Sequence, residues 1–274
     1  MLAAGLLLLG YGMLWEPRQL IERDHALRLD HWPATCDGLR VDVVADLHTG
    51  SWANGLDNLD RIVDRLQRSD ADIVLLAGDY VILLVPLGRY VDATKIAARL
   101  APLAASKPVY AVLGNHDWWK DGPRVGRAFA RAGIRMIDNA SAPVRVGDCR
   151  FHLAGLGDEL EGAPDVGAAW SGIPPAAPVI ALMHEPATLR RLPADVALAV
   201  SGHTHGGQIN PFSSPWRTAH FASDSHWLRG QVRDGERLLF VSPGIGTSIL
   251  PVRIGVLPEI SRLTLRSTAT AAAR

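Results

Sequence analysis

Five apolar segments of the sequence each end in side chains that can bind a metal ion. These side chains are Asp46 and His48, Asp79, Asn115 with His116, His184, and His203 with His205. In an extended segment, residues i and i+2 point the same way, so the Asp-x-His and His-x-His pairs could each act as a pincer. Imidazole and carboxylate donors without thiolates suit Mn, Fe, Zn or Co and do not choose among them.

Each of these motifs is weak when taken singly. A histidine at a strand end is more often a hydrogen-bonded loop residue than a ligand, and an aspartate after a glycine is usually a turn residue or helix cap. The metal-site interpretation depends on the arrangement, because ligands of open α/β sheets bind where the strands end. Asp79 stands alone after its strand, and its two oxygens are free to bridge two ions.

Alternating strands and helices are expected to position these side chains. Residues 39–45, 73–77 and 108–112 are apolar and partly β-branched, which predicts buried strands. Residues 56–66 place apolar side chains on one helical face, and residues 90–103 predict another helix. This alternation predicts an α/β fold with parallel strands and crossover helices.

The second half of the chain adds antiparallel strands to this pattern. A hairpin is predicted over residues 144–153, turning at Gly147-Asp148. Further strands are predicted over residues 179–183, 196–200, 238–241 and 260–265. Residues 161–178 and 211–227 are expected to be loops, and neither marks a domain boundary.

Composition limits the possible functions. The chain has 274 residues, 48% of them hydrophobic, which fits one large α/β domain or two small ones with a substantial core. Lys plus Arg and Asp plus Glu number 28 each, so the formal net charge is zero and no nucleic-acid partner is expected. Cys36 and Cys149 form no metal motif, and the sequence leaves open whether they pair.

The first 15 residues differ from the rest because they carry no charged side chain. A full membrane span needs about 20 apolar residues, so the segment is short for one. We nevertheless expect a membrane anchor rather than a buried core helix, because Trp15 followed by Glu16-Pro17-Arg18 resembles an interfacial boundary. The chain is accordingly expected to be membrane-associated through residues 1–15, on a side of the membrane that stays open.

Together these motifs resemble those of a known family. Asp46-Leu47-His48, Gly78-Asp79, Gly114-Asn115-His116-Asp117, the isolated His184 and Gly202-His203-Thr204-His205 resemble, in order, the motifs of calcineurin-like metallophosphoesterases. The resemblance runs from about residue 40 to residue 260, and it implies a four-layer α/β/β/α sandwich with mixed sheets and a dinuclear metal site at the strand ends.

The resemblance also implies a role for each site residue. By motif position it assigns Asp46, His48, Asp79 and His205 to one divalent ion, and Asp79, Asn115, His184 and His203 to the other. His116 is then the catalytic residue that faces the phosphate without binding a metal. The implied organisation is an N-terminal anchor and linker over residues 1–27, the catalytic domain over residues 28–266, and a frayed tail over residues 267–274.

Finer features are similar to a membrane-anchored bacterial branch of the family. They include Gly206-Gly207-Gln208, Trp118-Trp119 and Pro258-Glu259-Ile260. That branch contains phosphodiesterases and the UDP-diacylglucosamine pyrophosphatases of lipid A biosynthesis. The resemblance therefore implies hydrolysis of a phosphodiester or pyrophosphate bond in a phosphate-ester substrate, either a lipid-linked one such as a UDP-sugar lipid or a nucleotide.

Two alternatives stay open at this point: a phosphomonoesterase on soluble substrates, and a catalytically silent, membrane-tethered metal-binding module. One departure from the family bears on them. Family protein phosphatases carry an aspartate three positions after the bridging one, where this chain has Ile82. That departure argues against a protein phosphatase and leaves the residue that orients His116 unnamed.

Five further side chains are secondary candidates. Asp117 is expected either to support the site or to cap a helix, and the Trp118-Trp119 pair either to line a substrate face or to pack in the core. Asp158 is a weaker site candidate. For Arg253 we expect a surface ion pair rather than a phosphate contact.

Overall fold

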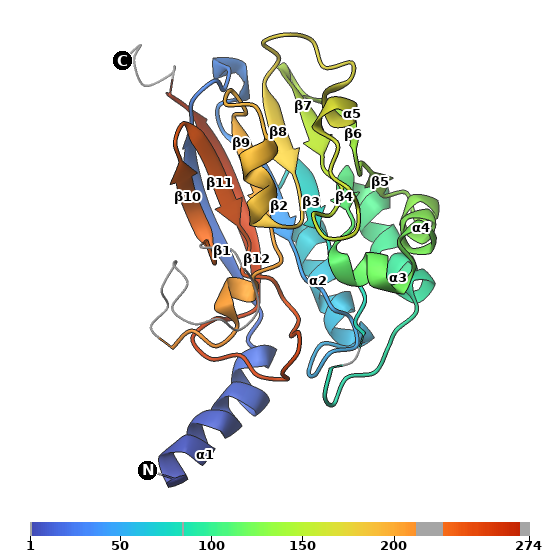
Figure 1. Ribbon diagram of the computed structural model, residues 1–274, viewed down its shortest axis with the longest axis vertical. Coiled ribbons are helices and arrows are strands. Elements are labelled where there is room, and N and C mark those ends of the chain that lie inside the picture. Colours follow the sequence, from blue (N-terminus) through green and yellow to red (C-terminus); the bar gives the residue numbers. More distant parts are fainter. Residues whose placement is uncertain (1, 84, 212–226, 269–274) are drawn as a thin grey trace.

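Two six-stranded sheets form the body of the molecule (Figure 1). The computed structural model describes residues 2–83, 85–211 and 227–268. The loop expected at residues 211–227 and the tail expected at residues 267–274 therefore lie almost entirely outside the described residues. Within them, the predicted α/β class with mixed sheets is confirmed.

The first sheet carries three of the helices. Its strands, in spatial order, are β1 (Ile21–Leu29), β12 (Glu259–Ser267), β2 (Leu39–Val44), β3 (Ile73–Ala77), β4 (Val109–Val112) and β5 (Arg135–Met136). Only the β12–β2 pair is antiparallel. The connections from β2 to β5 run through α2 (Leu56–Arg68), α3 (Ala93–Ser106) and α4 (Asn115–Arg131), as expected for parallel strands.

The second sheet mixes parallel and antiparallel pairs. Its strands, in spatial order, are β10 (Gly230–Asp234), β11 (Arg237–Val241), β9 (Leu198–Ser201), β8 (Val179–Leu182), β7 (Cys149–Gly155) and β6 (Ala140–Val146). The two outermost pairs are antiparallel and the inner pairs are parallel. The β6–β7 hairpin turns where the sequence predicts it, whereas the expected loop at residues 161–178 contains a short helix, α5 (Val166–Trp170).

Three hydrophobic clusters separate four layers. One cluster lies between the sheets, where Val43 and Leu75 of the first sheet meet Leu182 and Phe240 of the second. A second cluster lies between the first sheet and α2, α3 and α4. The third covers the outer face of the second sheet, under α5 and the 3-10 helix η4 (Pro186–Arg191). The implied α/β/β/α sandwich is therefore confirmed.

The N-terminal segment does not form the expected membrane anchor. It consists of α1 (Leu2–Gly10), the π-helix η1 (Tyr11–Trp15) and the 3-10 helix η2 (Glu16–Arg18). In the part of the chain that the structure describes, no helix has the length and apolar character needed to cross a membrane. The nine residues of α1 rise only about 14 Å, roughly half of a bilayer core. The expected membrane association through residues 1–15 is therefore wrong.

Nor is α1 a buried core helix, because Leu7 is 75% exposed. The chain joins the body of the domain just after α1. The Gly12 carbonyl accepts a hydrogen bond from the Arg253 backbone N–H at 2.9 Å, and the Trp52 indole donates to the Met13 carbonyl at 2.7 Å.

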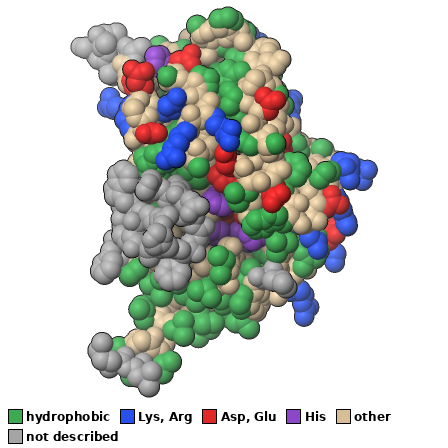
Figure 2. All heavy atoms as spheres, viewed as in Figure 1, with side chains coloured by type: hydrophobic (Ala, Val, Ile, Leu, Met, Phe, Trp, Pro, Cys, Tyr) green, Lys and Arg blue, Asp and Glu red, His purple; other side chains and the backbone are tan. Residues whose placement is uncertain are grey.

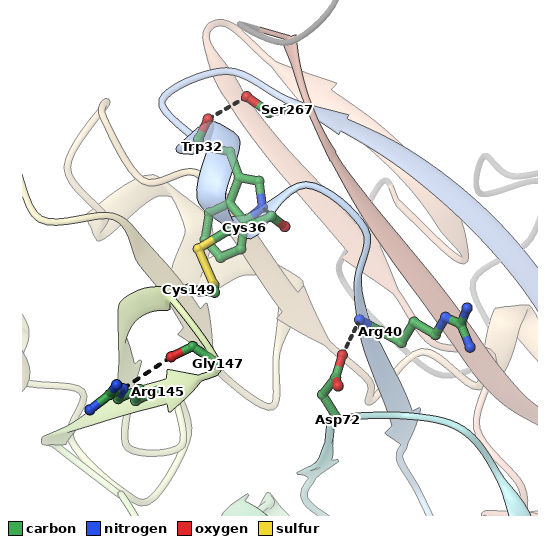
Figure 3. Close-up of a disulfide and its surroundings, with 8 residues drawn as sticks. All are labelled: Trp32, Cys36, Arg40, Asp72, Arg145, Gly147, Cys149 and Ser267. Carbon is green, nitrogen blue, oxygen red and sulfur yellow. Dashed lines mark hydrogen bonds between the residues drawn. A yellow bond between two sulfur atoms is a disulfide. The ribbon is translucent and has the colours of Figure 1, made fainter.

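A disulfide joins the two sheets through the segment that precedes β2. Cys36, in the 3-10 helix η3 (Ala34–Cys36), is bonded to Cys149 at the start of β7 (Figure 3). Both cysteines are buried, and the Trp32 ring packs beside them against Phe151. The pairing that the sequence left open is thus made, at the opposite ends of the strands from those that carry the candidate metal ligands.

Candidate metal centre

The chain turns sharply where the candidate ligands follow their strands. Asp46, His48, Asp79, His203 and His205 all have positive φ angles, between 37° and 71°. Non-glycine residues adopt this left-handed region at an energetic cost, and such residues cluster at functional sites. The turns also change one expectation. Asp46 and His48 nevertheless lie in one group of donor atoms, as the sequence predicts, whereas His203 and His205 lie in different groups and do not form a pincer.

The first ligand group consists of Asp46, His48 and His205, whose donor atoms lie within 4.8 Å of one another. The His48 Nε2 atom is 3.1 Å from the His205 Nε2 atom. Their Nδ1 atoms face the carbonyls of Val81 and Gly246 at 3.1 and 3.3 Å, which fixes the N–H on that side of each ring.

Both rings of this group are therefore neutral and turn lone pairs toward one another. Burial lowers the pKa of His48 to about 3 and the pKa of His205 well below its usual value, although the Asp79 carboxylate opposes both shifts. Two facing lone pairs repel each other unless a cation lies between them. The donor set thus fits a divalent metal ion.

The second ligand group consists of His184, His203 and Glu185, whose donor atoms lie within 4.8 Å of one another, and of Asn115, which contacts both histidines. The Asn115 Oδ1 atom is 3.2 Å from His184 Nε2 and 3.1 Å from His203 Nδ1. His184 donates its Nδ1 proton to the Ala77 carbonyl at 2.7 Å, so its Nε2 atom faces the group. Glu185 is in none of the motifs that the sequence analysis singled out. Its position next to His184 is the only sequence feature that points to it as a ligand.

Asp79 lies between the two groups. Its Oδ2 atom is 3.4 Å from His48 Nε2 and 3.3 Å from His184 Nε2, so one carboxylate oxygen reaches a histidine of each group. Burial alone would raise the pKa of Asp79, but His184 and His48 hold it well below its usual value. The same pairing raises the pKa of His184 well above its usual value against the effect of burial. Asp79 is therefore a buried anion shared by both groups.

Asp117 supports the turn that carries Asp79 and does not face the ligand groups. Its Oδ2 atom accepts hydrogen bonds from the backbone N–H of Asp79 at 2.9 Å and of Gly114 at 3.0 Å. Its Oδ1 atom accepts from Tyr80 and Val81 at 3.0 and 3.1 Å. Burial and the Asp79 charge raise the pKa of Asp117 to about 8, and these amides oppose that shift because they stabilise the carboxylate. Both interpretations of Asp117 hold, because Gly114 is also the N-cap of α4.

His116 lies beside the ligand groups, at the start of α4. Its ring centroid is 4.6 Å from that of His48, and its backbone N–H donates to Asp79 Oδ1 at 2.9 Å. The sequence leaves the residue that orients His116 unnamed; in the structure the Ser248 Oγ atom lies 3.5 Å from His116 Nε2. Burial lowers the pKa of His116, and Asp79 opposes that shift.

Arg253 corrects another expectation, because its side chain is fully buried. Its guanidinium donates to the carbonyls of Gly246, Pro243 and Val256, and its Nη2 atom lies 3.5 Å from His205 Nδ1. The predicted surface ion pair is therefore wrong. Arg253 instead holds together the loop on which the His205 ring rests, a role that a lone arginine in the sequence does not reveal.

The remaining candidates divide between core and rim. Trp118 packs against the core beneath α4, whereas Trp119 is 49% exposed and lies beside His116. Asp158 is buried, and its Oδ1 atom accepts hydrogen bonds from the backbone N–H of Leu160 and Glu161, so it shapes a loop and does not join either ligand group.

Comparison with known proteins identifies the family. The model of the calcineurin-like phosphoesterase family matches residues 39–207, more than half of the chain. The chain belongs to this family. Calcineurin-like phosphoesterases use two divalent metal ions, in agreement with the two ligand groups, and the chain is a dinuclear metal-dependent phosphoesterase.

Individual relatives of this calcineurin-like phosphoesterase cover most of its length. It is 29% identical to the metallophosphoesterase YkuE of Bacillus subtilis over 263 residues, which cover 94% of this chain and 90% of YkuE. It is 31% identical over 213 residues to the phosphodiesterase YaeI of Escherichia coli, covering 71% of this chain and 70% of YaeI. A crystal structure of a dimetal phosphatase from Danio rerio aligns with a TM-score of 0.46 at 13% identity, over 76% of this chain and 88% of that one.

Proposed function

We propose that this phosphoesterase hydrolyses phosphodiester or pyrophosphate bonds at the two ligand groups. One ion would be held by the first group together with Asp79, and the other by the second group together with Asp79. The observation that supports this assignment is the Asp79 Oδ2 atom, which lies within 3.4 Å of a histidine nitrogen from each group. Two divalent ions held there would activate a water molecule and neutralise charge on the phosphoryl oxygens.

His116 is proposed to act on the leaving group. Its imidazole adjoins His48, and its donor atom lies within 4.8 Å of those of His48 and Asp79. We assign it to the leaving group and not to an ion because it follows Asn115 at the start of α4 and lies at the edge of the two ligand groups. A proton on the ring would be donated to the leaving oxygen. Burial lowers the pKa of His116, and the Asp79 carboxylate opposes that shift. Ser248 would hold the ring in place through its hydroxyl.

For the substrate we propose a diester or pyrophosphate that carries a lipid or a nucleoside, of which a UDP-diacylglucosamine-like molecule is one example. Two features of the site support a diester over a monoester. A monoester brings additional negative charge, whereas the buried Arg253 guanidinium already donates to the carbonyls of Pro243 and Gly246 and contacts the Nδ1 side of the His205 ring. In addition, Ile82 occupies the position at which family protein phosphatases have an aspartate.

The test compares two chromogenic esters. Purified protein loaded with Mn would be assayed on bis-p-nitrophenyl phosphate and on p-nitrophenyl phosphate, with the Asp79→Asn variant as the matched inactive control. The proposal expects a higher kcat/KM for the diester. A preference for the monoester would contradict it and would favour a phosphomonoesterase.

A further inference from the structure

An exposed aromatic ring lies beside the proposed catalytic histidine. The Trp119 and His116 ring centroids are 5.2 Å apart, with 49° between the ring planes. The indole N–H donates to Glu161 Oε1 at 2.8 Å, so the ring is held by α4 at one end and by Glu161 at the other. A large aromatic side chain fixed in this way presents apolar surface to whatever binds next to His116.

The loop that holds Trp119 is itself fixed to the metal centre. Glu161 lies on residues 158–162, where the Asp158 carboxylate accepts hydrogen bonds from the backbone N–H groups two and three positions later, at 3.0 and 2.7 Å. The Glu159 N–H donates to Glu185 Oε2 at 2.9 Å, and Glu185 directly follows the ligand candidate His184. Trp119 is thereby positioned relative to the ligand groups through hydrogen bonds as well as through the chain.

A second apolar segment reaches His116 from the loop between β11 and β12. Ser248, which contacts the His116 ring, is followed by Ile249 and Leu250, which are 59% and 41% exposed. Gln208 fixes this segment, because its side-chain amide donates to the carbonyls of Ser248 and Leu250 and accepts from the Ser248 N–H.

The conformation of Ile249 is unusual for its residue type. Its φ angle is +63°, a region that β-branched residues rarely adopt. The loop therefore holds an apolar side chain in solvent at an energetic cost, next to a residue that contacts His116. Such strain is characteristic of binding sites. Figure 2 shows histidine side chains in a hollow of the surface with hydrophobic side chains along its border.

We infer that the leaving group of the substrate, which would lie on the His116 side of the site, carries an apolar group. Trp119 and Ile249 would bind this apolar group. The inference rests on the proposed function, since it assumes that His116 faces the leaving oxygen. It deepens that function by assigning the leaving side of the substrate an alkyl or aryl group, and by naming two residues that select for it without taking part in the chemistry.

Inhibition by simple dialkyl phosphates tests the inference. Dimethyl and dibutyl phosphate carry the same charge and differ only in apolar length, and both are measured as competitive inhibitors of Mn-dependent bis-p-nitrophenyl phosphate hydrolysis. Each buried methylene is worth about fourfold in affinity. We expect dibutyl phosphate to bind at least about tenfold more tightly than dimethyl phosphate to the wild-type protein.

Three variants locate the effect. Trp119→Ala and Ile249→Asn are each expected to reduce the ratio of the two inhibition constants to about threefold or less; asparagine tolerates the left-handed conformation, so that variant keeps the loop. Trp15→Ala, which removes an exposed tryptophan of η1, is the matched control and keeps the wild-type ratio. Equal inhibition of an active wild-type protein, or an unchanged ratio in both variants, would overturn this inference alone. Absence of diester turnover would overturn the proposed function and this inference with it.

Discussion

Replacing Asp117 by asparagine should weaken the metal centre, although the Asp117 side chain does not face the ligand groups. In Asp117→Asn one carboxylate oxygen becomes an NH₂ group, which then faces two backbone N–H donors in place of accepting from them. Each buried donor left without an acceptor costs about 1–3 kcal/mol. With two such donors, we expect the free energy of unfolding to fall by about 3 kcal/mol, a large share of the stability of a typical domain.

The same substitution should loosen the turn that carries Asp79. Urea unfolding would measure the loss of stability, and elemental analysis would measure a fall in bound metal below the wild-type content. Asp121→Asn is the matched control on the same helix, because Asp121 is exposed and accepts from the Arg124 backbone N–H; aspartate and asparagine cap helices about equally well. A loss below about 1 kcal/mol with full metal content in Asp117→Asn would refute the reasoning.

Four further results are expected. Asp79→Asn should bind less metal and lose diesterase activity; full metal content would show that Asp79 is not shared. His116→Ala should keep its metal but lower kcat about 10²-fold or more; a normal kcat with less metal would reverse its role. Arg253→Met should lower the free energy of unfolding by about 2–4 kcal/mol and weaken metal binding through His205. An unchanged metal affinity would show that Arg253 contributes to folding alone. Replacing Cys36 and Cys149 by serine should lower stability by about 2–5 kcal/mol with kcat unchanged, since a fall in kcat would mean that the link positions the site.

The parallel strands of the core could be predicted from the sequence, because their apolar runs are short and sharply bounded. The prediction for β3 matches its observed limits, residues 73–77. The edge strand β1 was not predicted, because Ile21–Leu29 contains four charged residues and no apolar run. Its place depends on pairing with β12 from the far end of the chain, which local sequence does not show.

The candidate ligands were easier to anticipate than their surroundings. Asp46, Asp79 and His184 come together because each follows the end of a strand, and this does not depend on the conformation of the segments between the strands. Ser248 and Arg253 could not be assigned roles, because the groups that they contact become neighbours only when the loops after β11 fold over His116 and His205. The anchor prediction failed for a related reason: apolar composition does not reveal where a helix ends or where the chain begins to pack.

The Cys36–Cys149 disulfide determines what happens when a protease cleaves the chain between the two cysteines. Cys36 and Cys149 are separated by 113 positions, and the long connections between β2 and β7 lie within that interval. A protease that cleaves one exposed loop there would leave two polypeptides that remain covalently attached. Such nicked protein would migrate as a single species until a reductant is added, and both pieces would still contribute their strands to the same sandwich.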